Sequence, residues 1–369
     1  MSDVTLSSVC VDIFDCEHKT APTSQSGYPS IRTPNIGRGF IIFNDLNLVD
    51  EDTYKAWTRR AVPQKDDIIF AREAPVGNAI IIPENFYPCL GQRTVLIRPN
   101  SDIVNPRYLL YSLLGNEMQA QIHSLTNGAT VHHLNVKDIK NLKIINFHER
   151  AEQDKIAEMI TVYDNLIENN NRRIAILEKM AQKLYRNESL KSETTCLLGE
   201  LVRFRRGKTI TKATISEGNV PVVAGGIQPA YYHNRANAKA PVLTVSASGA
   251  NAGYVNLYHA DIWASDCSFI DINDTENVYY FYVAMKDLQN QITFMQRGSA
   301  QPHVYPDDIS RLEIPALSRE LVDNLNKILT DIFNSIGNLK SKNEVLHKTR
   351  DHLLPRLISG DIDVSKIEL

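Results

Sequence analysis

The sequence contains few cysteines, and none of them form a closely spaced pair. Five occur in 369 residues, at Cys10, Cys16, Cys89, Cys196 and Cys267, and no two make a Cys-x-x-Cys motif. This odd, dispersed set, in a chain without a recognisable secretory signal, indicates reduced thiols in the cytosol. Long apolar runs are also missing, since none approaches the roughly 18 residues that a bilayer span needs. We therefore expect a cytoplasmic protein that makes no membrane contact.

The chain has no large excess of either charge. Its net charge is −3, with 22% charged and 43% hydrophobic residues, which is ordinary for a globular protein. This balance argues against a histone-like binder of nucleic acid, but it allows a DNA-binding protein whose basic residues lie on one face. The length predicts two domains of about 150 residues with connecting segments.

Complete catalytic motifs are missing as well. Residues 207–209, Gly-Lys-Thr, are similar to the end of a phosphate-binding loop, but Val202 stands where that motif requires glycine. Residues 105–108 are similar to the Asn-Pro-Pro-Tyr of amino-methyltransferases, but Arg107 replaces the second proline and no glycine-rich cofactor loop follows an early strand. Pro106 instead predicts the first turn of a helix. We expect no catalytic residue and no cofactor in this chain.

One segment of the sequence is present twice. Residues 121–144 and 291–314 align without a gap, and eight of the twenty-four positions are identical. The identical pairs are Gln121/Gln291, Ile122/Ile292, Gly128/Gly298, His133/His303, Asp138/Asp308, Ile139/Ile309, Leu142/Leu312 and Ile144/Ile314. Such similarity at a fixed offset indicates an internal duplication.

A heptad pattern follows each copy of this segment. The first seam is Ile156, Ile160, Tyr163, Ile167, Asn170, Ile174, Leu177, Ala181 and Leu184, and the second is Leu325, Leu329, Ile332, Ile336, Leu339, Asn343, Leu346, Arg350 and Leu353. One such stretch would suggest an amphipathic helix on a globular core, but two in equivalent places predict a pair of long helices packed on each other. The polar residues Asn170, Asn343 and Arg350 are expected to fix the register of this pair at some loss of stability.

The remaining parts alternate short β-rich runs with glycine, proline and asparagine. Strands are predicted at Phe40–Phe43, Asp67–Phe70, Ala79–Ile82 and Thr94–Ile97, and again at Val220–Val223, Val242–Val245, Gly253–Tyr258 and Ser268–Ile272. A helical stretch follows in each half, at Pro106–Ser124 and Asn277–Gln296. Each half therefore predicts an α+β domain with an irregular sheet.

His132, His133 and His303 are the histidines closest to a metal-binding pattern. His133 and His303 occur at equivalent positions of the repeat, but no further ligand stands at a matching spacing. A histidine that fixes a turn or contacts DNA once per domain is the favoured interpretation, so we expect no metal site. Asp138 and Asp308 are interpreted as residues that shape a turn.

Several segments of the sequence are similar to motifs of a known protein family. They are residues 15–22 (Asp-Cys-Glu-His-Lys-Thr-Ala-Pro), 27–31, 35–36, 66–72 with Gly77, 152–157 (Glu-Gln-Asp-Lys-Ile-Ala) and 354–364 (Leu-Pro-Arg-Leu-Ile-Ser-Gly-Asp-Ile-Asp-Val). Over nearly its whole length the chain resembles the specificity subunit of Type I restriction–modification systems. The helical and C-terminal phrases carry most of the likeness, because the domains that read DNA diverge with their targets.

The resemblance implies two similar target-recognition domains separated by two long antiparallel coiled-coil helices, related by a pseudo-twofold repeat. It implies a non-catalytic subunit that binds a bipartite site in double-stranded DNA and docks two DNA methyltransferase (modification) subunits on its helices. Restriction and translocase subunits would join the full complex. The domains would be residues 1–148 and 191–317, and the helices 149–190 and 318–354. Pro355 would end the second helix and leave a tail, 355–369.

The predicted helices have a length that suits a spacer. About 35 residues at a rise of about 1.5 Å span roughly 50 Å, and a DNA turn is about 34 Å long. The helices would then set the distance between two half-sites.

Basic residues before or within the β-rich core are the candidates for DNA contact. They are His18, Lys19, Arg32, Arg38, Arg72 and Arg93 in the first domain and Arg203, Arg205, Arg206, Lys208 and Lys212 in the second, with His133 and His303 from the repeat. Gln228, Asn251 and Gln301 are further candidates for base contacts. Each of these residues could equally be a solvated surface group.

Three alternatives differ in class or in partner. A related recognition subunit would serve a partner that fuses methylation and cleavage. A coiled-coil scaffold protein would have no role on DNA, and a stand-alone methyltransferase would need a cofactor motif that this sequence lacks.

Overall fold

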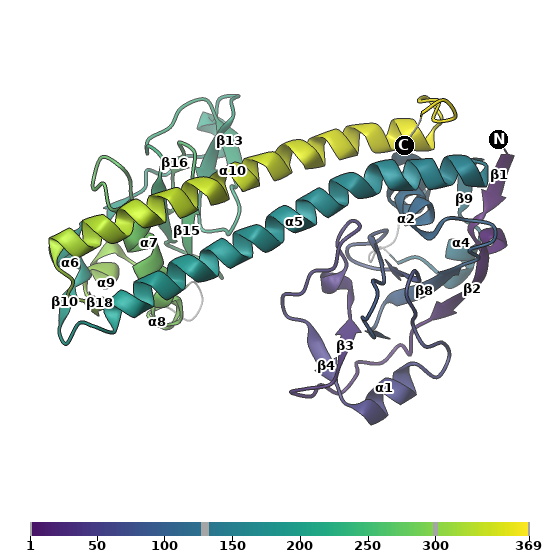
Figure 1. Cartoon of the computed structure of the whole chain (residues 1–369), viewed down its shortest axis with the longest axis horizontal. Coiled ribbons are helices and arrows are strands. Elements are labelled where there is room, and N and C mark those ends of the chain that lie inside the picture. The colour runs from purple at the N-terminus through teal and green to yellow at the C-terminus, as the bar shows by residue number, and fades with distance from the viewer. Residues whose placement is uncertain (1, 127–132, 298–301, 368–369) are drawn as a thin grey trace. The chain divides into compact units, whose positions relative to one another are not determined.

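The computed structural model describes residues 2–126, 133–297 and 302–367, and Figure 1 labels its helices and strands. Four residues named in the sequence analysis lie outside this part, namely Gly128, His132, Gly298 and Gln301. The chain divides into two compact units. The first unit comprises the residues up to Ile167 and those from Glu344 on, and the second comprises Glu168–Asn343.

A four-stranded antiparallel sheet forms the centre of the first unit. Its strands, in spatial order, are β2 (Cys10–Asp15), β8 (Thr94–Pro99), β5 (Ile68–Ala71) and β6 (Ala79–Ile81). All of β5 is buried, since Ile68 and Phe70 face one hydrophobic cluster while Ile69 and Ala71 face another. A sheet covered on both faces needs apolar residues on both, and the continuous apolar run of β5 supplies them.

Two smaller sheets belong to the same unit. One has the strand order β4 (Asn47–Val49), β3 (Tyr28–Ile31) and β7 (Cys89–Leu90), and the other pairs β1 (Ser2–Thr5) with β9 (Lys143–Phe147). The helical segments of the domain are η1 (Leu6–Val9), η2 (Thr33–Asn35), α1 (Glu51–Trp57), α2 (Pro106–Leu114), α3 (Asn116–Thr126) and α4 (Val136–Lys140).

The second unit has the same topology. Its four-stranded sheet has the order β11 (Arg205–Arg206), β17 (Cys267–Ile270), β14 (Val242–Ser246) and β15 (Val255–Tyr258). Its smaller sheets are β13 (Tyr231–His233), β12 (Val220–Val223) and β16 (Trp263–Ala264), and β10 (Thr195–Leu197) with β18 (Glu313–Pro315). Its helical segments are α6 (Leu198–Leu201), η3 (Lys212–Thr214), α7 (Val278–Asp287), α8 (Gln289–Phe294) and α9 (Pro306–Ser310).

Strand directions agree as well as strand order. β3 pairs with β7 in parallel, and so does β12 with β16, while both four-stranded sheets are antiparallel. The expectation of two repeated α+β domains is therefore confirmed. The repeat extends beyond the twenty-four aligned positions to the whole of each domain.

Side-chain hydrogen bonds are repeated too. Gln119 donates to the carbonyl of Gly77 at 3.0 Å, and Gln289 donates to the carbonyl of Gly253 at 2.9 Å. Both glycines have a positive φ, +88° and +80°, which a residue with a side chain adopts at a cost. These bonds hold the hairpin that follows β5 or β14 against the helix behind it.

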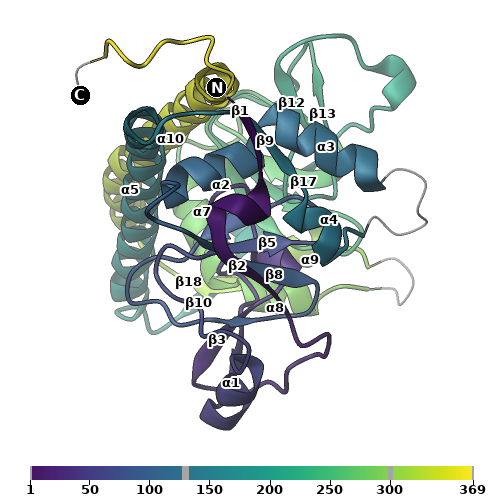
Figure 2. The same ribbon diagram turned by 90° about the vertical axis from the view of Figure 1, so that its right-hand side faces the viewer.

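Helix α2 begins as predicted. Pro106 occupies its first turn, and the side chain of Asn105 accepts hydrogen bonds from the backbone of Arg107 (2.9 Å) and Tyr108 (3.2 Å). The helix lies between the first part of α5 and the strands of the four-stranded sheet (Figures 1 and 2). The prediction of one helical stretch to Ser124 was wrong, because Gly115 ends α2 and a new helix begins at Asn116.

The predicted stretch in the second domain is divided in the same way. Helix α7 ends at Asp287, and α8 begins at Gln289. Leu288 between them is the C-cap of α7 and the N-cap of α8. The predicted strand Phe40–Phe43 was also wrong. It forms a loop, with a single bridge between Ile36 and Ile41, because the glycines at 37 and 39 allow a tight turn in which Gly37 donates to the carbonyl of Phe40 at 2.9 Å.

Two helices of forty residues carry the heptad seams, α5 (Arg150–Ser189) and α10 (Arg319–Ile358). Every residue of the two seams is buried or half-buried. In the first unit Arg350 binds Asp164 at 2.8 Å, and His148, just before α5, bonds the carbonyl of Ile358 at 3.0 Å. The start of α5 therefore faces the end of α10, as antiparallel packing requires.

The expected stop of the second helix at Pro355 was wrong, because α10 continues to Ile358. Proline removes one backbone donor, so the lost hydrogen bond is that to the carbonyl of Asp351. The turn after Pro355 carries Leu357 and Ile358, which are buried in the first unit together with Val364. This burial offsets the lost bond. It also makes residues 355–367 part of the core of the first unit instead of a separate tail.

The described helices include none that is both long enough and apolar enough to cross a bilayer. The two long helices are amphipathic, with one buried seam and a mostly polar remaining surface that also exposes a few apolar side chains.

We predict that the buried asparagines fix the register of α5 against α10 in the second unit. Asn170 donates to Asn343 at 2.8 Å, and Asn343 donates to Asn171 at 2.8 Å. Asn343→Leu should lower the free energy of unfolding by about 1–3 kcal/mol, because it leaves the buried amide of Asn170 without its partner. The double change with Asn170→Leu should recover most of that loss, since both polar groups are then removed.

The measurement is the urea unfolding midpoint of the full chain, with the exposed Asn338→Leu on α10 as control. A single variant as stable as the unchanged chain would contradict the prediction.

Candidate nucleic-acid interface

Three loops of the first domain meet at one end of its four-stranded sheet. They are the segment after β2, the hairpin from β5 to β6, and the connection from β3 to β4. The backbone of Gly39 donates to the carbonyl of Ala79 at 2.9 Å, and Asn78 donates to the carbonyl of Ile36 at 3.0 Å. The hairpin and the β3–β4 connection are thereby held together.

The second domain brings the equivalent loops together. Ser246, at the end of β14, donates to the carbonyl of Gly225 in the β12–β13 connection at 3.0 Å. Gly207, just after β11, donates to the carbonyl of Cys267 at 2.8 Å. Both domains therefore present a surface made of three loops at the same end of the same sheet.

Arg72 is the centre of a charged cluster in the first domain. Its guanidinium donates to Asp15 Oδ1 at 2.6 Å and to the carbonyl of Leu134 at 3.1 Å, and it lies 2.9 Å from His133 Nε2. Glu73 links His133 (2.9 Å) to Arg93 (2.8 Å). Four of the predicted DNA contacts, His18, Arg72, Arg93 and His133, thus share two carboxylates, Asp15 and Glu73.

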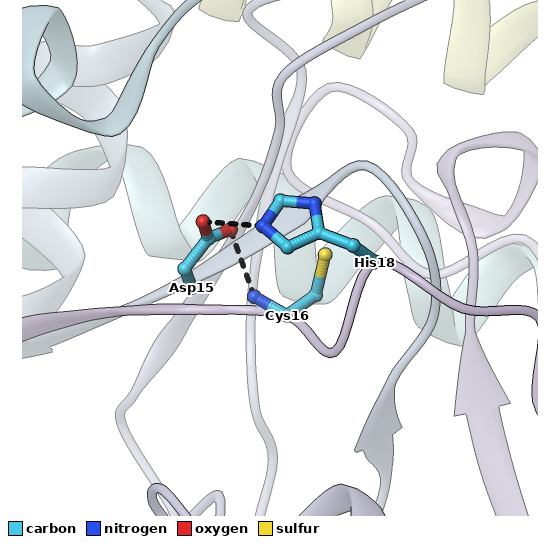
Figure 3. Close-up of side chains that lie close together, drawn as sticks. All are labelled: Asp15, Cys16 and His18. Carbon is cyan, nitrogen blue, oxygen red and sulfur yellow. Dashed lines mark hydrogen bonds and ion pairs between the residues drawn. The ribbon is translucent and has the colours of Figure 1, made fainter.

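Figure 3 shows that Asp15, Cys16 and His18 lie together at the end of β2. Their potential ligand atoms are within 4.8 Å of one another, which would suit a metal ion. However, Asp15 already binds His18 at 2.8 Å and Arg72 at 2.6 Å, so a cation would have to displace the guanidinium charge. A structural zinc site also has four protein ligands, and this group supplies three. The geometry fits a charged network better than a metal site.

The predicted basic cluster of the second domain divides into two kinds of residue. Arg205 is held by the fold, since it binds Asp271 (3.0 Å) and Asp274 (2.7 Å) and lies over the ring of Phe269 at 4.4 Å. Arg206 is less constrained. It lies 3.8 Å from Asp266 and 5.7 Å from the ring centre of Tyr305.

The lysines of this cluster point to solvent. Lys208 and Lys212 are exposed, and Lys212 lies 5.5 Å from the ring of Tyr231. Arg203 is exposed as well. His303 stacks on Tyr305 at 5.8 Å, next to Arg206.

Two predicted contacts of the first domain have structural roles. Arg32 donates to the carbonyl of Asp45 at 2.7 Å, and Arg38 donates to the carbonyl of Leu114 at 2.7 Å, which ties the β3–β4 connection to the end of α2. Lys19 is exposed beside His18. The candidates therefore do not act as one set, since some hold loops and others face solvent.

Aromatic, aliphatic and acidic residues of these loops were not predicted from the sequence. Phe40 and Phe43 are 54% and 62% exposed in the β3–β4 connection, and Ile227 is exposed in the equivalent loop of the second domain. The glycines on either side of Arg38 indicated a loop at this place in the sequence. The partners Asp15, Glu73 and Asp266 carried no such signal, because their pairing depends on strands far apart in sequence.

The sequence matches a known protein family over two segments that together cover most of the chain. The model of the Type I restriction modification DNA specificity domain matches residues 10–179 and again residues 193–347. The MjaIX specificity subunit of a Type I restriction enzyme from Methanocaldococcus jannaschii is 23% identical over 361 residues, covering 86% of this chain and 82% of that protein. A type I specificity subunit of Mycoplasma genitalium is 25% identical over 271 residues, covering 68% and 70%.

Among solved structures, the S subunit of a Type I restriction–modification system from M. genitalium has a similar fold. The TM-score is 0.60 at 20% identity, covering 96% of this chain and 95% of that one. Duplicated domains with paired long helices therefore define a protein of the DNA-specificity class. The chain belongs to the Type I restriction modification DNA specificity family, as a specificity subunit; catalysis lies in other subunits of such systems.

We predict that Asp271, directly after β17, stabilises the second domain through its contacts with Arg205 and the backbone of Lys239. Burial opposes its ionisation, but hydrogen bonds from the backbone of Lys239 and Asn273 and the charge of Arg205 outweigh this and hold its pKa below the usual value. The stability it contributes is therefore present above the ordinary aspartate pKa of about 4 and is lost as the pH falls through the lowered pKa.

Asp271→Asn should lower the free energy of unfolding by about 1–3 kcal/mol at pH 7, and the deficit should shrink progressively below about pH 4. Urea unfolding midpoints across that range would measure it, with the exposed Asp331→Asn as control. A deficit that is independent of pH would show that the charge of Asp271 has no part in it.

Proposed function

We propose that this subunit binds a bipartite site in double-stranded DNA, with one domain reading each half-site. One observation carries the proposal: the same three loops meet at the same end of the same sheet in both domains, but with different side chains. A single DNA-reading surface used twice, with diverged contacts, gives two half-sites of different sequence.

The charge of the loops supports contact with DNA. Lys19 in the first domain and Lys208 and Lys212 in the second are exposed, although the whole chain has a net charge of −3. Phosphate contacts from such residues supply affinity that depends on salt. Exposed apolar side chains in the same loops, such as Phe40, could contact the methyl group of thymine.

We further propose that two DNA methyltransferase subunits dock on the long helices, and that restriction and translocase subunits join the full complex. The seam residues are buried within the units, so docking would use other faces of the helices. In the first unit Val162 and Leu166 of α5 are exposed, and in the second Ile176 and Met180 are exposed four residues apart. A groove in the second unit is lined by Glu178, Lys179 and Gln182 of α5 and by Tyr282 and Lys286 of α7, among others.

A partner that fuses methylation and cleavage would dock in the same way, and the identity of the partner separates that alternative. The coiled-coil scaffold without a role on DNA is disfavoured by the family. Binding to duplex DNA that weakens as salt is raised, measured with the modification partner present, would distinguish a DNA-binding subunit from such a scaffold.

The proposal predicts a bipartite methylation motif. Cells that express this chain with its modification subunit should carry methylated sites with two specified half-sites and an unspecified gap. Replacing residues 191–317 by those of a related subunit should change one half-site and leave the other as it was. A motif without a gap, or a change in both half-sites, would contradict one domain per half-site.

A second prediction concerns the spacer. One added heptad in each long helix lengthens it by about 10 Å, or about three base pairs. The gap between half-sites should lengthen while the half-sites keep their sequence. A methylation-site map with unchanged spacing would rule out the helices as a ruler.

A further inference from the structure

Backbone hydrogen bonds identify which residues of the two domains are equivalent. Arg72 donates its N–H to the carbonyl of Arg93 at 2.9 Å and accepts from the N–H of Leu134 at 3.1 Å. In the second domain Ala247 donates to the carbonyl of Asp266 at 3.1 Å and accepts from the N–H of Val304 at 3.0 Å. Arg72 therefore corresponds to Ala247, and Arg93 corresponds to Asp266.

The strand register adds a third pair of positions. Phe70 of β5 lies opposite Val95, which lies opposite Asp15 on β2. Val245 of β14 lies opposite Ser268, which lies opposite Arg206 on β11. The two series of paired residues cross the strands of the two sheets in the same order. Asp15 therefore corresponds to Arg206.

The charges at two of these positions are inverted between the domains. The first domain has a carboxylate on the edge strand and an arginine before β8 (Asp15 and Arg93), whereas the second has an arginine on the edge strand and a carboxylate before β17 (Arg206 and Asp266). The third position is arginine in the first domain and alanine in the second. The two domains thus share the same backbone arrangement, but a hydrogen-bond donor (arginine) in one domain stands where the other domain has an acceptor (aspartate).

Exposure separates the arginines by role. The whole of Arg72 is 5% exposed, and its guanidinium is already bound to Asp15, His133 and the carbonyl of Leu134. The side chains of Arg93 and Arg206 are 61% and 49% exposed, and each lies beside one carboxylate, Glu73 at 2.8 Å or Asp266 at 3.8 Å. A carboxylate on one side leaves the other donors of the guanidinium for a ligand.

Resting on the proposed function, we infer that Arg93 and Arg206 are the specificity-determining arginines of the two half-sites, each reading the edge of a guanine. Arginine presents two parallel donors that match the O6 and N7 acceptors of guanine. Because Arg93 precedes β8 while Arg206 lies on the edge strand β11, the two arginines occupy different positions of equivalent sheets, and the guanine occupies a different place in each half-site. Arg72 is a positioning residue: it holds Asp15 and His133, and His133 in turn binds Glu73, the carboxylate beside Arg93.

The test uses the full chain with its modification subunit and a map of methylated sites. Arg93→Gln should reduce discrimination at one guanine of one half-site by about 5- to 150-fold, the range expected for a bidentate contact. Arg206→Gln should do the same in the other half-site. Lys65→Gln and Lys239→Gln are matched controls, because these exposed lysines precede β5 and β14 at the opposite end of each strand, and they should leave the motif unchanged.

A positioning role for Arg72 has its own readout. Arg72→Lys keeps the charge but cannot reach all three partners, so discrimination at the Arg93 half-site should fall while the dependence of binding on salt stays the same. If Arg93→Gln prevents folding, Arg93→Lys retains the charge, and its loss of discrimination tests the same contact.

The outcomes separate the inference from the function it rests on. A wild-type map without two half-sites overturns the proposed function. A bipartite wild-type motif that Arg93→Gln and Arg206→Gln leave unchanged overturns the inference alone. Uniform loss of binding at every sequence, with a salt slope reduced by about one, would assign these arginines to phosphates and also overturns it.

Discussion

Backbone hydrogen bonding along one buried antiparallel strand pair determines the rest of each domain. β5 pairs with β8, and β14 pairs with β17, over four residue pairs in each case. A shift by one residue would turn Ile68 and Phe70 towards the cluster that Ile69 and Ala71 now face. Since each face is filled by a different set of side chains, the register has one solution, and the loops that leave the strands start from fixed points.

This constraint explains why the loops can diverge. The carbonyls of Gly77 and Gly253 are held by Gln119 and Gln289, and both hairpins accept a backbone hydrogen bond from the segment after the repeated histidine. Affinity for a new sequence can then be obtained by changing side chains at fixed backbone positions. Asp15 and Arg206 occupy such a position with opposite charge.

The helices and the domains depend on each other in each unit. Asn105 binds Asp154 at 2.7 Å in the first unit, and Asn277 binds Asp323 at 2.9 Å in the second, so the helix after each sheet is tied to the start of a long helix in the same way. In the first unit Leu357 and Val364, close to the end of the chain, are buried with Leu6 near its beginning. A core built from both ends of the sequence could not be inferred from local pattern.

The sequence by itself determined the duplication, the α+β class and the two heptad helices, because identity at a fixed offset and apolar spacing are local properties of the chain. It predicted the start of α2 at Pro106 and most of the strands for the same reason. It failed at Phe40–Phe43 and at Pro355, where turn geometry and distant burial outweigh local preference. Only the tertiary structure decided that Arg72 is buried while Arg93 is exposed, because strand pairing brings Asp15 within 2.6 Å of Arg72 across fifty-seven residues of sequence.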